Sequence, residues 1–151
     1  MSKQSLLATL ALAVAACNST TPKSDPLQLV GRGGFSYRAT TLTGQPLLEG
    51  TMTLEWSGDS TASGRPFSGV WTIQWAAGAD QNTSVGPQVG TGTLDGIAQE
   101  AGVTISLNPA MLDNNVILHA RVDGHTLIGN WIHSTLAGPT TQGHFAAENT
   151  R

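Results

Sequence analysis

The sequence has few of the residue types that form most functional sites: charged residues, cysteine and tyrosine. Of its 151 residues 11% are charged, against about a quarter in an ordinary globular domain, and it has one cysteine and one tyrosine. A single cysteine excludes an internal disulfide framework and a metal site built from several cysteines. The seven Lys and Arg residues are scattered rather than clustered, so we expect no nucleic-acid partner.

A long apolar run is also missing, apart from one segment at the N-terminus. Lys3 precedes the apolar residues 6–15, and polar residues follow from Asn18 onward. A membrane-spanning helix needs about 20 apolar residues, roughly twice what is present. A basic start, a short apolar middle and small residues before a cleavage point are instead typical of a secretory signal peptide.

The cleavage point carries its own motif. Val14-Ala15-Ala16-Cys17 resembles the lipobox of bacterial lipoprotein precursors. The resemblance implies that residues 1–16 are a lipoprotein signal peptide and that Cys17 carries the lipid that holds the mature protein on a membrane. Asn18 stands where an aspartate retains many Gram-negative lipoproteins in the inner membrane. The resemblance therefore implies an outer-membrane anchor, with the protein facing the periplasm.

The mature chain divides into a tether and one domain. Residues 17–29 contain Pro22, Pro26 and several hydroxyl residues without any periodicity, which predicts a flexible tether to the lipid. Residues 30–151 are enough for a single domain with its own core. The mature chain has six basic and ten acidic residues, a net charge of −4.

From Val30 onward apolar and polar residues alternate, and no window keeps the 3.6-residue spacing of an amphipathic helix. The pattern predicts an all-β domain. It gives eight strands of about ten residues, over 32–41, 48–57, 66–76, 88–96, 101–108, 115–122, 125–134 and 140–148.

The clearest turn signal is Asp123-Gly124, which suits a two-residue type I′ hairpin. Pairing outward from such a turn sets Leu118 against Gly129 and Val116 against Trp131. These residues lie on the apolar face of each strand, so the register agrees with the alternation.

Eight sequential antiparallel strands favour an up-and-down barrel, because closure removes exposed sheet edges. Glycines on the apolar face support this, since a small barrel needs small residues opposite large ones; Gly143 beside Trp131 is one such pair. A β-sandwich is the alternative fold. In strand count, order and length, though in no sequence motif, residues 30–148 resemble the lipocalin and avidin barrels, which bind ligands.

The sequence shows no residue spacing that is typical of a catalytic or metal-binding site. The four histidines lack a spacing that brings three ligands together, so we expect no metal and no cofactor. No serine lies in a Gly-x-Ser-x-Gly motif, and the glutamates Glu49 and Glu55 fall on a polar strand face. We therefore predict that the protein is not an enzyme.

The tryptophans suggest a binding function. All four lie on apolar strand faces, where they either fill the core or line a ligand pocket. Longer connections gather at the barrel end that receives residues 77–87, 109–114 and 135–139, which makes it the candidate mouth. For a small apolar or amphipathic ligand we predict Trp75, His133 and Asn115 at this mouth, with Trp71 and Trp131 deeper.

A second hypothesis is a solid barrel that acts as an envelope scaffold or an inhibitor. Ile117, Ile128 and Ile132 are predicted on the outward face of two adjacent strands. An apolar patch on the outside of a domain usually marks contact with another molecule. This surface is therefore the candidate site for a protein partner.

Overall fold

The structure is a computed structural model and describes residues 26–31 and 33–151. The signal peptide, the lipobox with Cys17 and most of the tether lie outside the described residues, so those predictions stay predictions. Within the described part, no helix is long and apolar enough to cross a membrane.

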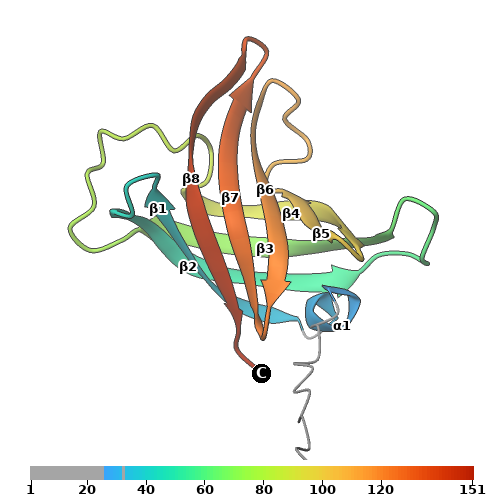
Figure 1. Cartoon of the computed structure of the whole chain (residues 1–151). Helices are drawn as coiled ribbons and strands as arrows, with labels where there is room; N and C mark the ends of the chain where they lie inside the picture. Colours follow the sequence, from blue (N-terminus) through green and yellow to red (C-terminus); the bar gives the residue numbers. More distant parts are fainter. Residues whose placement is uncertain (1–25, 32) are drawn as a thin grey trace, which may run out of the picture.

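Eight antiparallel strands form a closed barrel in which each strand pairs with its neighbours in sequence order (Figure 1). The prediction of an all-β, up-and-down barrel is confirmed, and the sandwich alternative is wrong. The strands are β1 Gly34–Thr41, β2 Pro46–Trp56, β3 Arg65–Trp75, β4 Gly90–Gln99, β5 Gly102–Ser106, β6 Asn114–Asp123, β7 Thr126–Thr135 and β8 Gly138–Asn149. Each lies within three residues of its predicted range.

Pairing of the first strand with the last closes the barrel. β1 pairs with β8 over seven residues, from Phe35 opposite Asn149 to Thr41 opposite Gly143. No β-strand edge is left between them, which removes the template for edge-to-edge aggregation. In Figure 1 the strands β6 to β8 run crosswise to β2 to β5, as the twist of a small closed sheet requires.

Alternation along each strand places apolar side chains inside the barrel and Thr, Ser and charged residues outside. Most of the buried apolar residues form one cluster with strands on every side. The largest side chains with under 2% exposure include Trp131, Tyr37, Phe35, Phe67 and Met52. Burial of each large apolar side chain stabilises the fold by about 1.5–3 kcal/mol, so this cluster is the main stabilising element.

Close packing inside the barrel explains the glycine at position 143. A Cβ there would lie against the carbonyl of Thr40 and 2.5 Å from Nε1 of Trp131. The indole of Trp131 therefore fills the space that a side chain at 143 would need, as the sequence predicted. Its N–H donates a hydrogen bond to the Thr40 carbonyl at 3.1 Å.

The β6–β7 hairpin differs from the prediction by two residues. Asp123 pairs with Thr126, so the turn is Gly124-His125, and Leu118 lies opposite Trp131. Among the described residues only glycines have positive φ, and Gly124 has φ of 61° at the first central position. That is the requirement of a type II′ turn rather than type I′. Because strand faces repeat every two residues, the shift leaves every inward residue inward.

One turn of helix, α1 (Pro26–Val30), precedes the barrel. Residues 26–29 were expected to belong to the tether and no helix was expected, so the ordered domain begins earlier than the alternation indicated. Leu29 is 3% exposed and Val30 is fully buried. The helix contacts β2, β4 and β6 at the end where the chain reaches its C-terminus (Figure 1). The buried side chains of Leu29 and Val30 therefore close this end of the barrel, called the helix end below.

Candidate functional site

Two of the tryptophans predicted to line a pocket are part of the packed interior. Trp71 and Trp131 are 3% and 1% exposed. The indole N–H of Trp71 donates to the Leu107 carbonyl at 2.7 Å, and that of Trp131 bonds to Thr40. Both indole N–H groups donate to backbone carbonyls, so neither is left to bind a ligand.

His133 also faces inward, as predicted, but its ring is engaged on both sides. Its Nε2 donates to Oδ1 of Asn114 at 2.8 Å, and its Nδ1 lies 2.8 Å from the hydroxyl of Thr140. The ring is 8% exposed, and Gly86 of the β3–β4 connection packs directly against it. This histidine therefore links the first residues of β6 and β8 to the β3–β4 connection at this end of the barrel.

The other two predicted mouth residues are separated by the barrel wall. Trp75 is half-buried at the end of β3 and packs against the core. Asn115 neighbours the inward Val116 and lies on the outer face, where its amide donates to Oγ of Ser106 at 2.7 Å. The structure thus brings Trp71, Trp131 and His133 inside and leaves Asn115 outside.

The predicted mouth is closed by the chain's own β3–β4 connection, residues 76–89. Val85 and Gln88 insert into the barrel, at 5% and 0% exposure. The Tyr37 hydroxyl donates to Oε1 of Gln88 at 3.1 Å, and Nε2 of Gln88 donates to the Val85 carbonyl at 2.6 Å. Complete burial raises the pKa of the Tyr37 phenol. We call this end of the barrel the loop end.

The apolar residues predicted on the outer face are where the alternation placed them. Ile117 lies directly opposite Ile132 across the β6–β7 ladder, and Ile128 lies further along β7 opposite Arg121. All three side chains are half-buried. We call these three residues the isoleucine surface. Ile117 and Ile132 form one cross-strand pair, and the outward pair of His119 and Asn130 separates them from Ile128.

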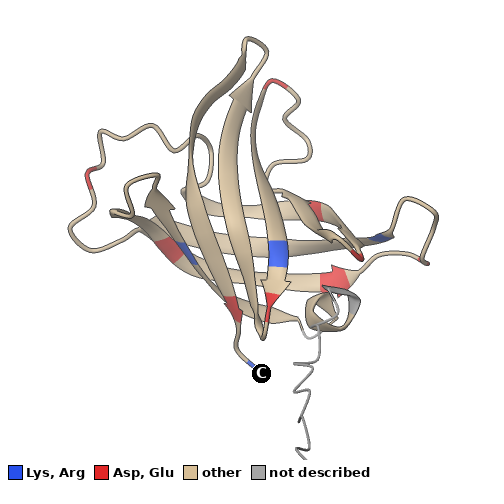
Figure 2. Cartoon of the chain, viewed as in Figure 1, with Lys and Arg blue, Asp and Glu red and all other residues tan. Residues whose placement is uncertain are grey.

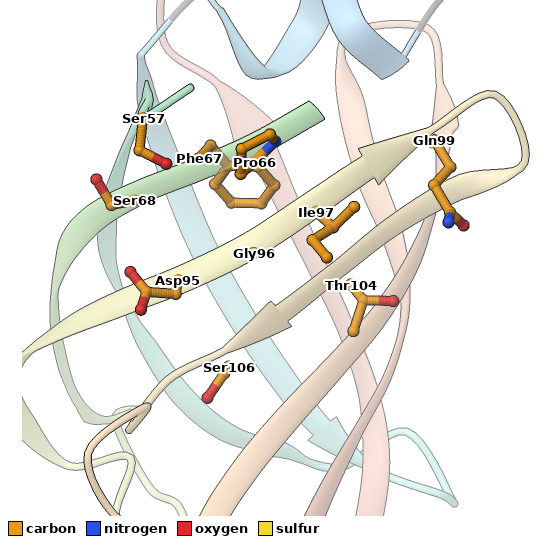
Figure 3. A pocket seen from close by; sticks show the side chains of 10 residues that line it. All are labelled: Ser57, Pro66, Phe67, Ser68, Asp95, Gly96, Ile97, Gln99, Thr104 and Ser106. Carbon is orange, nitrogen blue, oxygen red and sulfur yellow. The ribbon is translucent and has the colours of Figure 1, made fainter. Parts of the chain in front are cut away.

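A hollow that the sequence did not indicate opens on the outside of β3, β4 and β5, with a volume of about 630 Å³ (Figure 3). Apolar residues contribute to its lining: Pro66, Phe67, Gly96 and Ile97. Polar residues surround them: Ser57, Ser68, Asp95, Gln99, Thr104 and Ser106. We call this depression the outer hollow.

The outer hollow has no linear sequence signal, because its residues come from three strands and lie far apart in the chain. Only the cross-strand register brings Ser68, Asp95 and Ser106 into one row. The sequence could have pointed to it only through Ile97, an apolar residue at an outward strand position, where the structure leaves it 42% exposed. Over the described residues, His, Cys, Asp and Glu form no group of three that would hold a metal ion.

Comparison of the chain with protein-family models, with curated proteins and with solved structures gives no match. The likeness to lipocalin and avidin barrels therefore stays one of architecture.

Proposed function

We propose that the mature protein is a lipid-anchored, non-enzymatic protein of the bacterial envelope that acts through the outside of its barrel. The anchor rests on the lipobox at Cys17. The mode of action rests on one structural observation: the inward side chains of the described residues pack into one buried cluster, and α1 and the β3–β4 connection cover the two ends.

Because both ends of the barrel are covered, binding of a ligand inside it requires free energy to displace the chain's own residues. An incoming molecule must displace buried side chains such as Trp131, or the inserted Gln88, and break the hydrogen bonds that they make. A buried polar group left without its partner costs about 1–3 kcal/mol. Contact on the outer surface needs no such rearrangement.

A fluorescence titration tests this proposal. Trp71 and Trp131 report on the interior, so a ligand that enters the barrel changes tryptophan emission. For the mature chain with Cys17→Ser, we expect no saturable quenching by alkyl-chain probes. Saturable quenching at one site per chain would contradict the proposal and favour an internal ligand.

The isoleucine surface is the first place to look for a protein contact. An envelope extract is passed over the immobilised native protein and over the Ile128→Glu variant. A partner that uses this surface is lost with Ile128→Glu and kept with Val70→Glu, a matched change on the opposite wall. Val70 is a suitable control because it is 54% exposed on an outer strand face. Retention of every partner by Ile128→Glu would exclude this surface.

A small apolar or amphipathic ligand inside the barrel is the second candidate function. It is favoured by the loop end, where only a connecting segment, through Val85 and Gln88, covers the interior. If that segment swings out, Trp75 lies at the opening. Trp75→Ala should then weaken probe binding far more than it lowers the melting temperature. A variant that melts early yet binds the probe normally would identify Trp75 as ordinary core.

A further inference from the structure

The outer hollow holds one carboxylate between two hydroxyls. Asp95 on β4 lies directly opposite Ser68 of β3 on one side and Ser106 of β5 on the other. Neighbouring side chains in such a cross-strand row have Cβ atoms about 5 Å apart, so on each side of Asp95 one hydroxyl lies close to the carboxylate. Figure 3 shows Ser68, Asp95 and Ser106 along one side of the hollow. Asp95 itself is exposed to solvent.

An apolar floor begins one step along the same strand. Ile97 is the next outward residue of β4, with Pro66 opposite it on β3. Its side chain is 42% exposed, although it lies on a regular strand rather than in a loop. The hollow therefore offers an apolar surface that leads to a carboxylate two residues away, about 7 Å along the strand.

Asp95 is the one charged residue that lines the hollow. The outward charged residues of the wall formed by β2 to β5 are Glu49, Glu55 and Asp95. The basic residue of these strands, Arg65, stacks over the ring of Trp56 at 4.3 Å and donates to the Gly58 carbonyl. Within the described part of the chain, Asp95 has no ion-pair partner. Figure 2 shows how sparse charges are over the barrel, so the three acidic residues of this wall outnumber its one basic residue.

We propose that the outer hollow binds a lysine side chain presented by a protein partner. An ammonium group beside Asp95 donates to its carboxylate and to one flanking hydroxyl, of Ser68 or of Ser106, and its third donor faces water. Its four-carbon stem lies along Ile97 and Pro66, an arrangement in which such a stem buries apolar area while its charge stays near water. An arginine fits less well, because a planar guanidinium uses both oxygens of one carboxylate and leaves the flanking hydroxyls unused.

This inference rests on the proposed function, since it names the chemistry of a partner that binds the outside of the barrel. Ser106 keeps an acceptor position for the ligand, although it already accepts a hydrogen bond from Asn115. An exposed ion pair of this kind contributes little by itself. The lysine therefore gives orientation and selectivity to a larger contact.

Nuclear magnetic resonance of the full mature chain with Cys17→Ser tests the site with matched probes. Nα-acetyl-lysine methylamide is titrated beside the norleucine analogue, which lacks only the ammonium group, and beside the arginine analogue. We expect the lysine probe to shift the backbone amides of Asp95, Ile97 and Ser106 most strongly. The shifts should be saturable and should weaken with added salt, since the pair is exposed.

Two variants distinguish an effect of the Asp95 charge on probe binding from an effect of the protein's net charge. Asp95→Asn should weaken the lysine probe about fivefold, the most that an exposed ion pair normally contributes. Glu148→Gln, an equal change of charge on β8, should leave its affinity unchanged. Equal shifts from the norleucine probe, stronger shifts from the arginine probe, or no shifts from any probe would each overturn the lysine assignment.

The outcome for the outer hollow is separable from that for the proposed function. If the lysine probe fails while Ile128→Glu still loses its partner, the inference is wrong and outer-surface binding stands. If apolar probes quench Trp71 and Trp131 saturably, the proposed function is wrong whatever the hollow binds.

Discussion

The two ends of the barrel are closed by different chemistry. At the helix end, Leu29 and Val30 of α1 insert apolar side chains only. At the loop end, Gln88 enters together with Val85 and is held by hydrogen bonds to Tyr37 and to the backbone. Hydrophobic burial is non-directional, whereas a hydrogen-bonded closure is correct in only one geometry. The helix end therefore contributes mainly stability, and the loop end contributes a specific conformation.

The two ends of the barrel also differ in the apolar side chains that they expose to solvent. Leu112 and Leu136, on the β5–β6 and β7–β8 connections, are 94% and 86% exposed. Both lie just beyond the last pair of the β6–β7 ladder, Asn114 opposite Thr135, at the loop end. At the helix end no described connection exposes a large apolar side chain. The chain thus buries its apolar residues where it leads to the tether and exposes some at the far end.

The largest expected effect on stability comes from truncating the buried side chains at the helix end. Replacing both Leu29 and Val30 by alanine should lower the free energy of unfolding by about 3–6 kcal/mol, since two buried side chains are truncated. Denaturant unfolding measures it. Gln28→Ala on the same turn is the control and should change little, because Gln28 is exposed. A double variant as stable as the native chain would mean that α1 does not close the barrel.

At the loop end, Gly86→Ala should cost about 2–3 kcal/mol of unfolding free energy. Gly86 has φ of 66°, and an added Cβ would lie 2.6 Å from the ring of His133. Gly78→Ala in the same connection has a similar φ of 76° but no neighbour within 4 Å, so about 1 kcal/mol is expected. Equal losses in the two variants would show that the contact with His133 contributes nothing.

High pH should weaken the loop end specifically. Burial raises the pKa of Tyr37 above its usual 10.0, so above pH 10 the unfolded chain releases a proton that the native chain keeps. The free energy of unfolding should therefore fall by about 1.4 kcal/mol per pH unit above that value. Tyr37 is the only tyrosine, so tyrosinate absorbance should appear only with unfolding. Tyr37→Phe should lack this slope; a native chain that forms tyrosinate before it unfolds would contradict the buried geometry.

The smallest effect on stability is expected from Cys17→Ser, in the predicted tether outside the described residues. The free energy of unfolding should change by less than about 0.5 kcal/mol, as for other substitutions that touch no core residue. Fractionation should change completely, because the protein loses its lipid and leaves the membrane fraction. A variant that stays with the membranes would show that the anchor is elsewhere.

The sequence alone was sufficient for the strands and their faces. Alternation depends on the two-residue period of a strand, which is local, so eight strands and inward residues such as Trp71 and Trp131 were predicted correctly. The exact turn was less well defined, because Asp123-Gly124 and Gly124-His125 are both short turns that keep the faces. The helix α1 was missed since five residues are too few to show a helical period.

Tertiary structure decided how the barrel is closed and where its outer hollow lies. Tyr37 and Gln88 are 51 residues apart, and Trp131 bonds to a carbonyl 91 residues away. The row of Ser68, Asp95 and Ser106 exists only after three strands have fixed their register. The local pattern determined what each strand turns inward, because that depends on neighbours in the chain. Closure of the ends and the position of hydroxyls beside Asp95 depend on neighbours across the sheet, which no stretch of sequence specifies by itself.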